Sequence, residues 1–219
     1  MTDPSPVRQP GFEPGAASNA ELLAQLLFEP PPGPRALRSA QRLLERAGSL
    51  RALLASQTPG GPLERSIRAR LNRLPAAVEL VRRSLAEHLG ERPSLASPEA
   101  VRHFLCLWLR ERPSECFAVL FLDTQNRLIT AQVMFQGSVS QTVVHPREVA
   151  RRALELNAAA LIVAHNHPSG VAEPSMADRM LTDGLRSALK TLDLPVLDHL
   201  IVGGNRCFSF AESGLLRAS

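Results

Sequence analysis

The chain has 219 residues, of which 44% are hydrophobic and only 4% aromatic, so it is expected to fold around an aliphatic core rather than to be disordered. It contains no run of the roughly 20 apolar residues that a membrane helix needs, and no apolar stretch behind a basic start that would form a secretory signal. The three cysteines, Cys106, Cys116 and Cys207, are widely spaced, which argues against a disulfide framework and favours core positions. A cytoplasmic location is therefore the default expectation.

The formal charge of +4 is unevenly distributed along the chain. Residues 1–97 carry 13 Arg and 9 acidic residues, whereas residues 98–219 carry 11 Arg, one Lys and 12 acidic residues. The whole positive excess thus lies in the first part. A basic domain is one mark of nucleic-acid binding, although a solvated helical surface has the same composition. DNA is a candidate partner of this part of the chain.

The first part has the pattern of a small helical bundle. Residues 1–18 are rich in Pro and Gly and are expected to form a flexible tail. From residue 19 onward, apolar side chains recur at helical spacing, and breaks at Gly48 and at residues 58–62 separate them into four or five helices. We expect a helical domain over residues 19–92, with a proline-containing linker before residue 98.

The second part, residues 98–219, alternates helical and strand patterns. A helix is expected from Pro98 to about Arg112, with Ser97 as its N-cap. Further helices are expected at 146–156 and 175–192, and strands at 117–122, 128–135, 139–144, 159–164, 196–202 and 207–210. Strands interleaved with helices predict an α/β layered domain with a mixed sheet.

The segment 164–178 carries the residues with the clearest chemistry. His165 and His167 lie two residues apart at the end of a strand, so both imidazoles point to one face and the residue between them points to the other. Ser175 is a natural N-cap, which puts Asp178 in the first turn of a helix, where its carboxylate can reach the same ion. Two imidazoles and one carboxylate leave one position of a Zn²⁺ site open for water, as catalytic zinc sites do.

Each half of this pattern also has a simpler interpretation. The pair Ser175 and Asp178 is close to a capping box, which needs no metal, and a lone His-x-His is common on protein surfaces. The two interpretations are compatible, because Ser175 can cap the helix that presents Asp178.

The joint pattern, His-x-His-x(7)-Ser-x-x-Asp, resembles the JAMM motif of MPN+ metalloproteases. The strings HNHPSG, PSMAD, VHPREV and LDHLIVGG resemble the bacterial RadC family in particular, over about residues 98–219. The resemblance implies a three-layer JAMM/MPN domain related to the cytidine-deaminase architecture. It also implies His165, His167 and Asp178 as zinc ligands, a glutamate as general base, and Ser175 as the residue that stabilises the oxyanion.

The glutamate must lie upstream of the histidine pair. Glu115 is the preferred candidate, because it opens the first apolar strand. Glu148 is the alternative, but it lies only 17 residues before His165, on a predicted helix where an acidic residue needs no function. In the implied mechanism, Glu115 takes a proton from a metal-activated water and passes it to the leaving amine of a peptide or isopeptide bond.

Other functions fit parts of the sequence. A DNA-binding or DNA-repair accessory role is the main alternative, but the helix-hairpin-helix expected in RadC-like N-terminal regions is not recognisable here. A nucleobase deaminase needs His-x-Glu and Pro-Cys-x-x-Cys, and the chain has neither. A metal-free interaction domain is disfavoured, because all four JAMM positions have candidates. His145 and His199 belong to RadC-like strings, and each either supports the ligands or is an ordinary hydrogen-bonded histidine at a strand end.

Overall fold

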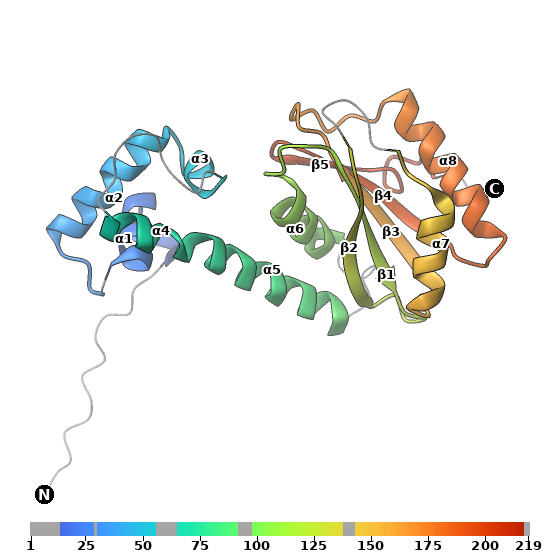
Figure 1. Ribbon diagram of the computed structural model, residues 1–219, viewed down its shortest axis with the longest axis horizontal. Helices are drawn as coiled ribbons and strands as arrows, with labels where there is room; N and C mark the ends of the chain where they lie inside the picture. The colour runs from blue at the N-terminus through green and yellow to red at the C-terminus, as the bar shows by residue number, and fades with distance from the viewer. Residues whose placement is uncertain (1–13, 29, 56–64, 92–97, 138–142, 217–219) are drawn as a thin grey trace, which may run out of the picture. The chain divides into compact units, whose positions relative to one another are not determined.

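The computed structural model describes residues 14–28, 30–55, 65–91, 98–137 and 143–216 (Figure 1). The chain divides into two compact units, Met1–Val78 and Glu79–Ser219. Within the described ranges, no helix combines the length and the apolar character needed to cross a membrane. The predicted combination of a small helical bundle and an α/β layered domain is confirmed.

The first unit is helical throughout its described residues. Its elements are a short 3₁₀ helix (Pro14–Ala16), α1 (Asn19–Leu27), α2 (Pro34–Ala47), α3 (Leu50–Ala55), α4 (Arg65–Leu71) and the beginning of α5 (Arg73–Glu91). Ser18 and Glu21 form a capping box at the start of α1, and Gly48 ends α2 in the left-handed conformation, with φ of 76°. The core consists largely of buried leucines from these helices. The expected break at residues 58–62 lies outside the described residues.

The second unit is built on a five-stranded mixed sheet. Its strands are β1 (Cys116–Leu122), β2 (Leu128–Gln136), β3 (Ala160–Asn166), β4 (Val196–Gly203) and β5 (Arg206–Ser209), in the order β2-β1-β3-β4-β5. Only the β3–β4 pair is parallel. All residues of β1 and β3 are buried, as expected for strands covered on both faces.

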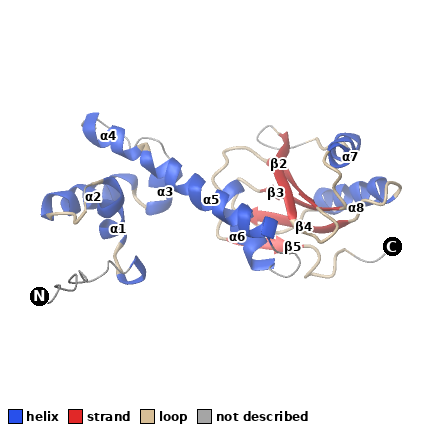
Figure 2. Cartoon of the chain, turned by 90° about the horizontal axis from the view of Figure 1, so that it is seen from below, coloured by secondary structure: helices blue, strands red, loops and turns tan. Residues whose placement is uncertain are grey.

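Helices cover both faces of this sheet, which gives the predicted three layers. Helix α6 (Pro98–Leu109) lies on one face, and α7 (Pro146–Glu155) and α8 (Met176–Lys190) lie side by side on the other (Figures 1 and 2). Alternate residues of β1 divide between the two cores: Ala118 and Leu120 face α6, whereas Phe117 and Val119 face α7 and α8. We call these the α6 face and the α7/α8 face.

Two strand predictions differ from the structure. The expected strand at 139–144 falls largely on residues outside the described ranges, and Val143 and Val144 lie in no strand. Strand β3 runs to Asn166, two residues beyond the expected end. Its polar end stays in the sheet because it is paired on both sides: His165 lies opposite Phe117 of β1 and beside Ile201 of β4.

The cysteines occupy apolar positions, as predicted, and all three are free. Cys116 is fully buried in β1. Cys106 and Cys207 are half-buried against the core of the α6 face.

The turn between β4 and β5 supports the loop that follows β3. A β-carbon on Gly203 would lie only 2.5 Å from the backbone nitrogen of Ala172 and from the carbonyl carbon of Val171. Gly204 has φ of 55° and also approaches this loop, close to the carbonyl oxygen of Gly170. The absence of a side chain at Gly203 therefore lets the β4–β5 turn and the loop after His167 come into backbone contact.

We predict that Gly203→Ala destabilises the protein by about 1–3 kcal/mol, because the added methyl group must displace backbone rather than a flexible side chain. Gly184→Ala is the matched control: Gly184 is an exposed residue within α8, and an added β-carbon would meet nothing within 4 Å. This control should stabilise by about 0.5–1 kcal/mol, the usual gain in a helix. Urea denaturation measures both, and equal stabilities of the two variants would contradict the predicted contact.

Candidate metal centre

Strand β3 presents His165 on the α7/α8 face. The side chain of His165 follows Leu161 and Val163 along the same face and is 1% exposed. His167 comes directly after the strand, and its N–H donates to the carbonyl of Val202 at 2.8 Å, so the pairing with β4 continues past the end of β3. The two imidazoles therefore share one face, as the spacing predicted.

Helix α8 supplies the carboxylate. Ser175 is its N-cap, and the Asp178 N–H donates to the Ser175 Oγ at 3.1 Å. In return, the Ser175 N–H and hydroxyl donate to Asp178 Oδ2 at 2.7 and 2.6 Å. The capping box is thus formed. It leaves Asp178 Oδ1 outside the box and directed at the histidines, 3.1 Å from His165 Nε2.

Three electron-pair donors converge at this point. His165 Nε2 lies 2.9 Å from His167 Nε2, and Asp178 Oδ2 lies 3.6 Å from His167 Nε2. In the described parts of the chain, His165, His167 and Asp178 are the one group of three or more such residues close enough to hold a metal ion. Ligands about 2.0–2.1 Å from a tetrahedral Zn²⁺ lie about 3.3 Å from each other, so the separations fit a single ion.

Hydrogen bonds determine which ring nitrogens are available. His167 Nδ1 lies 2.7 Å from the carbonyl oxygen of Val171, which can only accept, so Nδ1 of His167 carries the proton. His165 Nδ1 lies 2.8 Å from Nε2 of His199. The Nε2 atoms of both candidate ligands face the carboxylate, and Nε2 is the atom that a metal would take.

The charges in the site are strongly influenced by burial and hydrogen bonding. Burial raises the pKa of Asp178, but its contacts with His165 and Ser175 outweigh that effect and hold this pKa well below its ordinary value. Burial lowers the pKa of His199 well below its ordinary value, so that ring is neutral. The site thus holds an ionised carboxylate beside a neutral supporting imidazole, which suits a cation.

The strand register is the evidence for where Glu115 lies relative to the three candidate ligands. In the antiparallel pairing of β1 and β3, Phe117 is opposite His165, and continuing that register places Glu115 opposite His167. Glu115 is half-buried, directly before β1, and its carbonyl accepts the Gly137 N–H at 2.9 Å. Alternation along the strand puts its side chain on the α7/α8 face, as for Phe117.

Glu148, the other candidate base, has ion-pair partners on its own helix. It lies in the first turn of α7, with Arg151 Nε 3.1 Å and Arg147 Nε 3.6 Å from its carboxylate oxygens. His145 is the N-cap residue of the same helix, and its ring lies against Phe135. These contacts account for both residues without a role in the metal group.

Asn166 has a structural role that its sequence position did not reveal. Its side chain is buried and turns away from the histidines: Oδ1 accepts the Cys116 N–H at 2.8 Å, and Nδ2 donates to the carbonyls of Ser114 and Arg112 at 3.2 and 3.4 Å. One amide thus fixes the backbone on both sides of Glu115. A polar residue inside a buried strand was the available signal, because such a group needs partners.

The sequence gives no direct signal for a role of Thr182, and it leaves two roles open for His199. His199 Nδ1 lies 2.6 Å from Thr182 Oγ1, while its Nε2 contacts the candidate ligand His165. The spacing of Thr182, four residues after Asp178 on one helix, places both on the same side of α8. Nothing in the sequence alone showed that β4 would bring His199 between them.

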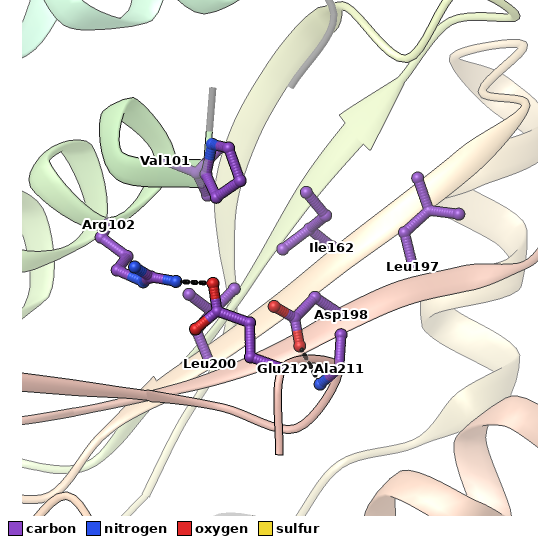
Figure 3. Close-up of a pocket in the computed structure, with 9 residues that line it drawn as sticks. Val101, Arg102, Ile162, Leu197, Asp198, Leu200, Ala211 and Glu212 are labelled. Carbon is purple, nitrogen blue, oxygen red and sulfur yellow. Dashed lines mark hydrogen bonds and ion pairs between the residues drawn. The ribbon is translucent and has the colours of Figure 1, made fainter. Parts of the chain in front are cut away.

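A small pocket of about 110 Å³ lies on the α6 face (Figure 3), and no histidine lines it. Its apolar lining includes Ile162 and Leu200, and an ion pair between Arg102 and Glu212 closes one side. The carboxylate of Asp198 accepts hydrogen bonds from the hydroxyl of Ser209, at the end of β5, and from the N–H of Ala211. The charged groups of this pocket are engaged with neighbouring residues, so the group on the α7/α8 face remains the candidate functional site.

Comparison with known proteins gives consistent matches. The RadC-like JAB domain family matches residues 95–215. A UPF0758 protein of Methylibium petroleiphilum is 50% identical over 204 residues, which cover 93% of this chain and 92% of the relative. A UPF0758 protein of Leptothrix cholodnii is 49% identical over 210 residues, with the same coverage. A relative from Burkholderia thailandensis is 50% identical over 202 residues and is covered to 77% of its length.

We predict that Ser175→Ala costs about 0.5–2 kcal/mol of stability and weakens zinc binding about 10–100-fold, because Asp178 loses a hydrogen bond that orients it. The chain offers a control in Ser18→Ala, which removes the equivalent capping box from α1. That variant should lose similar stability and keep full zinc affinity. Thermal denaturation and competition with a chromophoric chelator measure the two effects, and unchanged zinc affinity in Ser175→Ala would refute the orienting role.

Proposed function

Because this chain belongs to the RadC-like JAB domain family, we propose that it is a zinc-dependent hydrolase of the JAMM type, which cleaves peptide or isopeptide bonds in a peptide or protein substrate. The main observation behind the proposal is that two imidazole Nε2 atoms and one carboxylate oxygen lie close enough together to bind one ion. The β1–β3 register supports it further, because its continuation beyond Phe117 and His165 would place Glu115 opposite His167.

The donor set favours zinc and an open site. Two imidazoles and one carboxylate are typical of catalytic zinc, and a fourth position is then left for water or substrate. A bound Zn²⁺ supplies Lewis acidity, which lowers the pKa of its water towards 7 and polarises the substrate carbonyl. His165, His167 and Asp178 hold the ion in this proposal, and Asp178 also lowers its net charge.

Glu115 is the proposed general base. Its carboxylate accepts a proton from the attacking water and then gives that proton to the nitrogen of the leaving amine as the C–N bond breaks. Because Glu115 gives up the proton that it accepted, it is an ionised carboxylate again after the two steps. The hydrogen bonds of Asn166 to the backbone around Glu115 support this role, because they fix the position of the base relative to β3.

Ser175 is the proposed oxyanion donor. In the structure its hydroxyl hydrogen points to Asp178 Oδ2, so it must turn towards the substrate to donate there. The Ser175 N–H also donates to Asp178 Oδ2, at 2.7 Å, and keeps the carboxylate in place when the hydroxyl turns. One oxyanion donor is worth about 2.7–4 kcal/mol in other hydrolases.

The test compares two glutamates in zinc-loaded protein. We expect the wild type to cleave members of a peptide library, chelator to stop cleavage, and zinc to restore it. Glu115→Gln should keep zinc and lose about 10²–10⁴-fold in kcat, because the base is gone. Glu148→Gln, the matched control, should keep both zinc and activity. His167→Ala should lose tight zinc binding.

Mass spectrometry of the library and zinc analysis of each variant provide the readouts. Full activity of Glu115→Gln, or loss of activity in Glu148→Gln alone, would exclude Glu115 as the base. Cleavage by the wild type that persists without metal would exclude the zinc mechanism.

DNA binding by the helical unit is the second candidate, and helix α2 favours it. Arg35, Arg38, Arg42 and Arg46 are all exposed, and their spacing of three and four residues forms one stripe along the helix. The buried residues of α2, Ala40 and Leu43, lie on a different side. Such a stripe matches the phosphates of a duplex, which contribute sequence-independent, salt-dependent affinity.

If α2 contacts DNA, replacing Arg38 and Arg42 with Gln should weaken duplex binding and reduce the slope of log K against log salt by about 1 for each lost contact. Arg147→Gln with Arg206→Gln removes the same charge from exposed positions of the other unit and is the control. Fluorescence anisotropy at about 50–200 mM salt gives both slopes. Equal slopes for the two double variants would rule out the stripe as the contact.

A further inference from the structure

Three hydrogen bonds connect four groups behind the candidate metal site, and a close contact completes the circuit. Thr182 Oγ1 lies 2.5 Å from the carbonyl oxygen of Asp178 and 2.6 Å from His199 Nδ1. His199 Nε2 lies 2.8 Å from His165 Nδ1. His165 Nε2 in turn lies 3.1 Å from Asp178 Oδ1. The circuit therefore starts at the backbone of Asp178 and returns, through His165, to the side chain of Asp178.

The carbonyl oxygen of Asp178 can only accept a hydrogen bond, and this determines which group donates in each of the three hydrogen bonds. The carbonyl oxygen of Asp178 has no hydrogen, so the Thr182 hydroxyl donates to it. A hydroxyl has one hydrogen, so Thr182 Oγ1 must accept from His199, whose proton then sits on Nδ1. The neutral His199 ring has its lone pair on Nε2, and His165 must donate to it from Nδ1. His165 Nε2 is thereby left to face the ion.

We propose that Thr182 and His199 are positioning residues that fix the ring proton of His165 on Nδ1 and so keep His165 Nε2 available to the metal. Neither residue would contact the ion itself, and their role in metal binding rests on the metal site proposed above. His167 obtains the same tautomer more simply, from the carbonyl of Val171.

The surroundings of His199 hold its ring in one orientation. The side chain is fully buried, stacked on Phe210 with ring centroids 4.8 Å apart and in edge contact with Phe117. Its backbone N–H donates to Asp198 Oδ1, and its carbonyl accepts from Phe210. A flip of the His199 ring would place carbon atoms opposite Thr182 Oγ1 and His165 Nδ1, and both hydrogen bonds would be lost. The two ring nitrogens therefore keep their partners.

The test replaces only the Thr182 hydroxyl. In Thr182→Val a methyl group faces His199 Nδ1, and a buried N–H there would have no acceptor, which is costly. The proton then moves to Nε2 of His199, His165 must accept on Nδ1, and its own proton moves to Nε2, where it competes with the metal. We expect zinc affinity to fall about 10–100-fold, as for other residues that support a metal ligand. Thr182→Ser keeps the hydroxyl and should bind zinc like the wild type.

Two readouts separate positioning from general stability. Chelator competition gives the zinc affinity of each variant, and long-range ¹H–¹⁵N spectra of the histidine rings give the nitrogen that carries each proton. The wild type and Thr182→Ser should show His199 protonated on Nδ1 with or without zinc, and Thr182→Val should show it on Nε2. A merely structural threonine would change stability but not the ring signals.

A wild-type spectrum with the His199 proton on Nε2 would overturn the proposal, and so would a folded Thr182→Val with wild-type zinc affinity. If circular dichroism shows that Thr182→Val does not fold, the ¹H–¹⁵N spectrum of the wild type still tests the proposal. If the wild type binds no zinc at all, the proposed hydrolase function fails, while the spectrum of the metal-free protein still tests the hydrogen-bonded circuit.

Discussion

The second unit must hold two imidazole nitrogens and one carboxylate oxygen close together, although their lone pairs repel one another. His165 Nε2 lies 2.9 Å from His167 Nε2 and 3.1 Å from Asp178 Oδ1, and His165 and Asp178 are buried. Without positive charge among them, their lone pairs repel each other, and burial strengthens that repulsion. A cation removes the conflict, and the rest of this unit is best understood as the support that keeps the three atoms in position.

That support comes from elements far apart in the sequence. Pairing of β3 with both neighbours extends the strand over His165, and the Gly203 turn lets the loop after His167 pack closely. The capping box of α8 uses one oxygen of Asp178 and leaves the other for the site. The same residue pair therefore begins a helix and presents a candidate ligand, so the structural and functional interpretations of Ser175 and Asp178 do not compete.

Local pattern was sufficient to predict the fold class, most elements and the grouping of His165, His167 and Asp178, because these depend on spacing along the chain. His165 and His167 were readable from strand alternation, and Asp178 from the helix start. The circuit through Thr182 and His199 was not readable, because it depends on the register of β4 beside β3, and these two residues lie 17 positions apart. Asn166 likewise acts on a segment 50 residues away. Long-range register is the information that a single sequence lacks.

The most direct test is a crystal grown with zinc, with anomalous differences collected on both sides of the zinc absorption edge. The account predicts one zinc peak per chain, about 2.0–2.2 Å from His165 Nε2, His167 Nε2 and Asp178 Oδ1, with a fourth ligand that is not a protein atom. A map with no zinc among these three side chains, or with a fourth protein side chain closing the coordination, would contradict it.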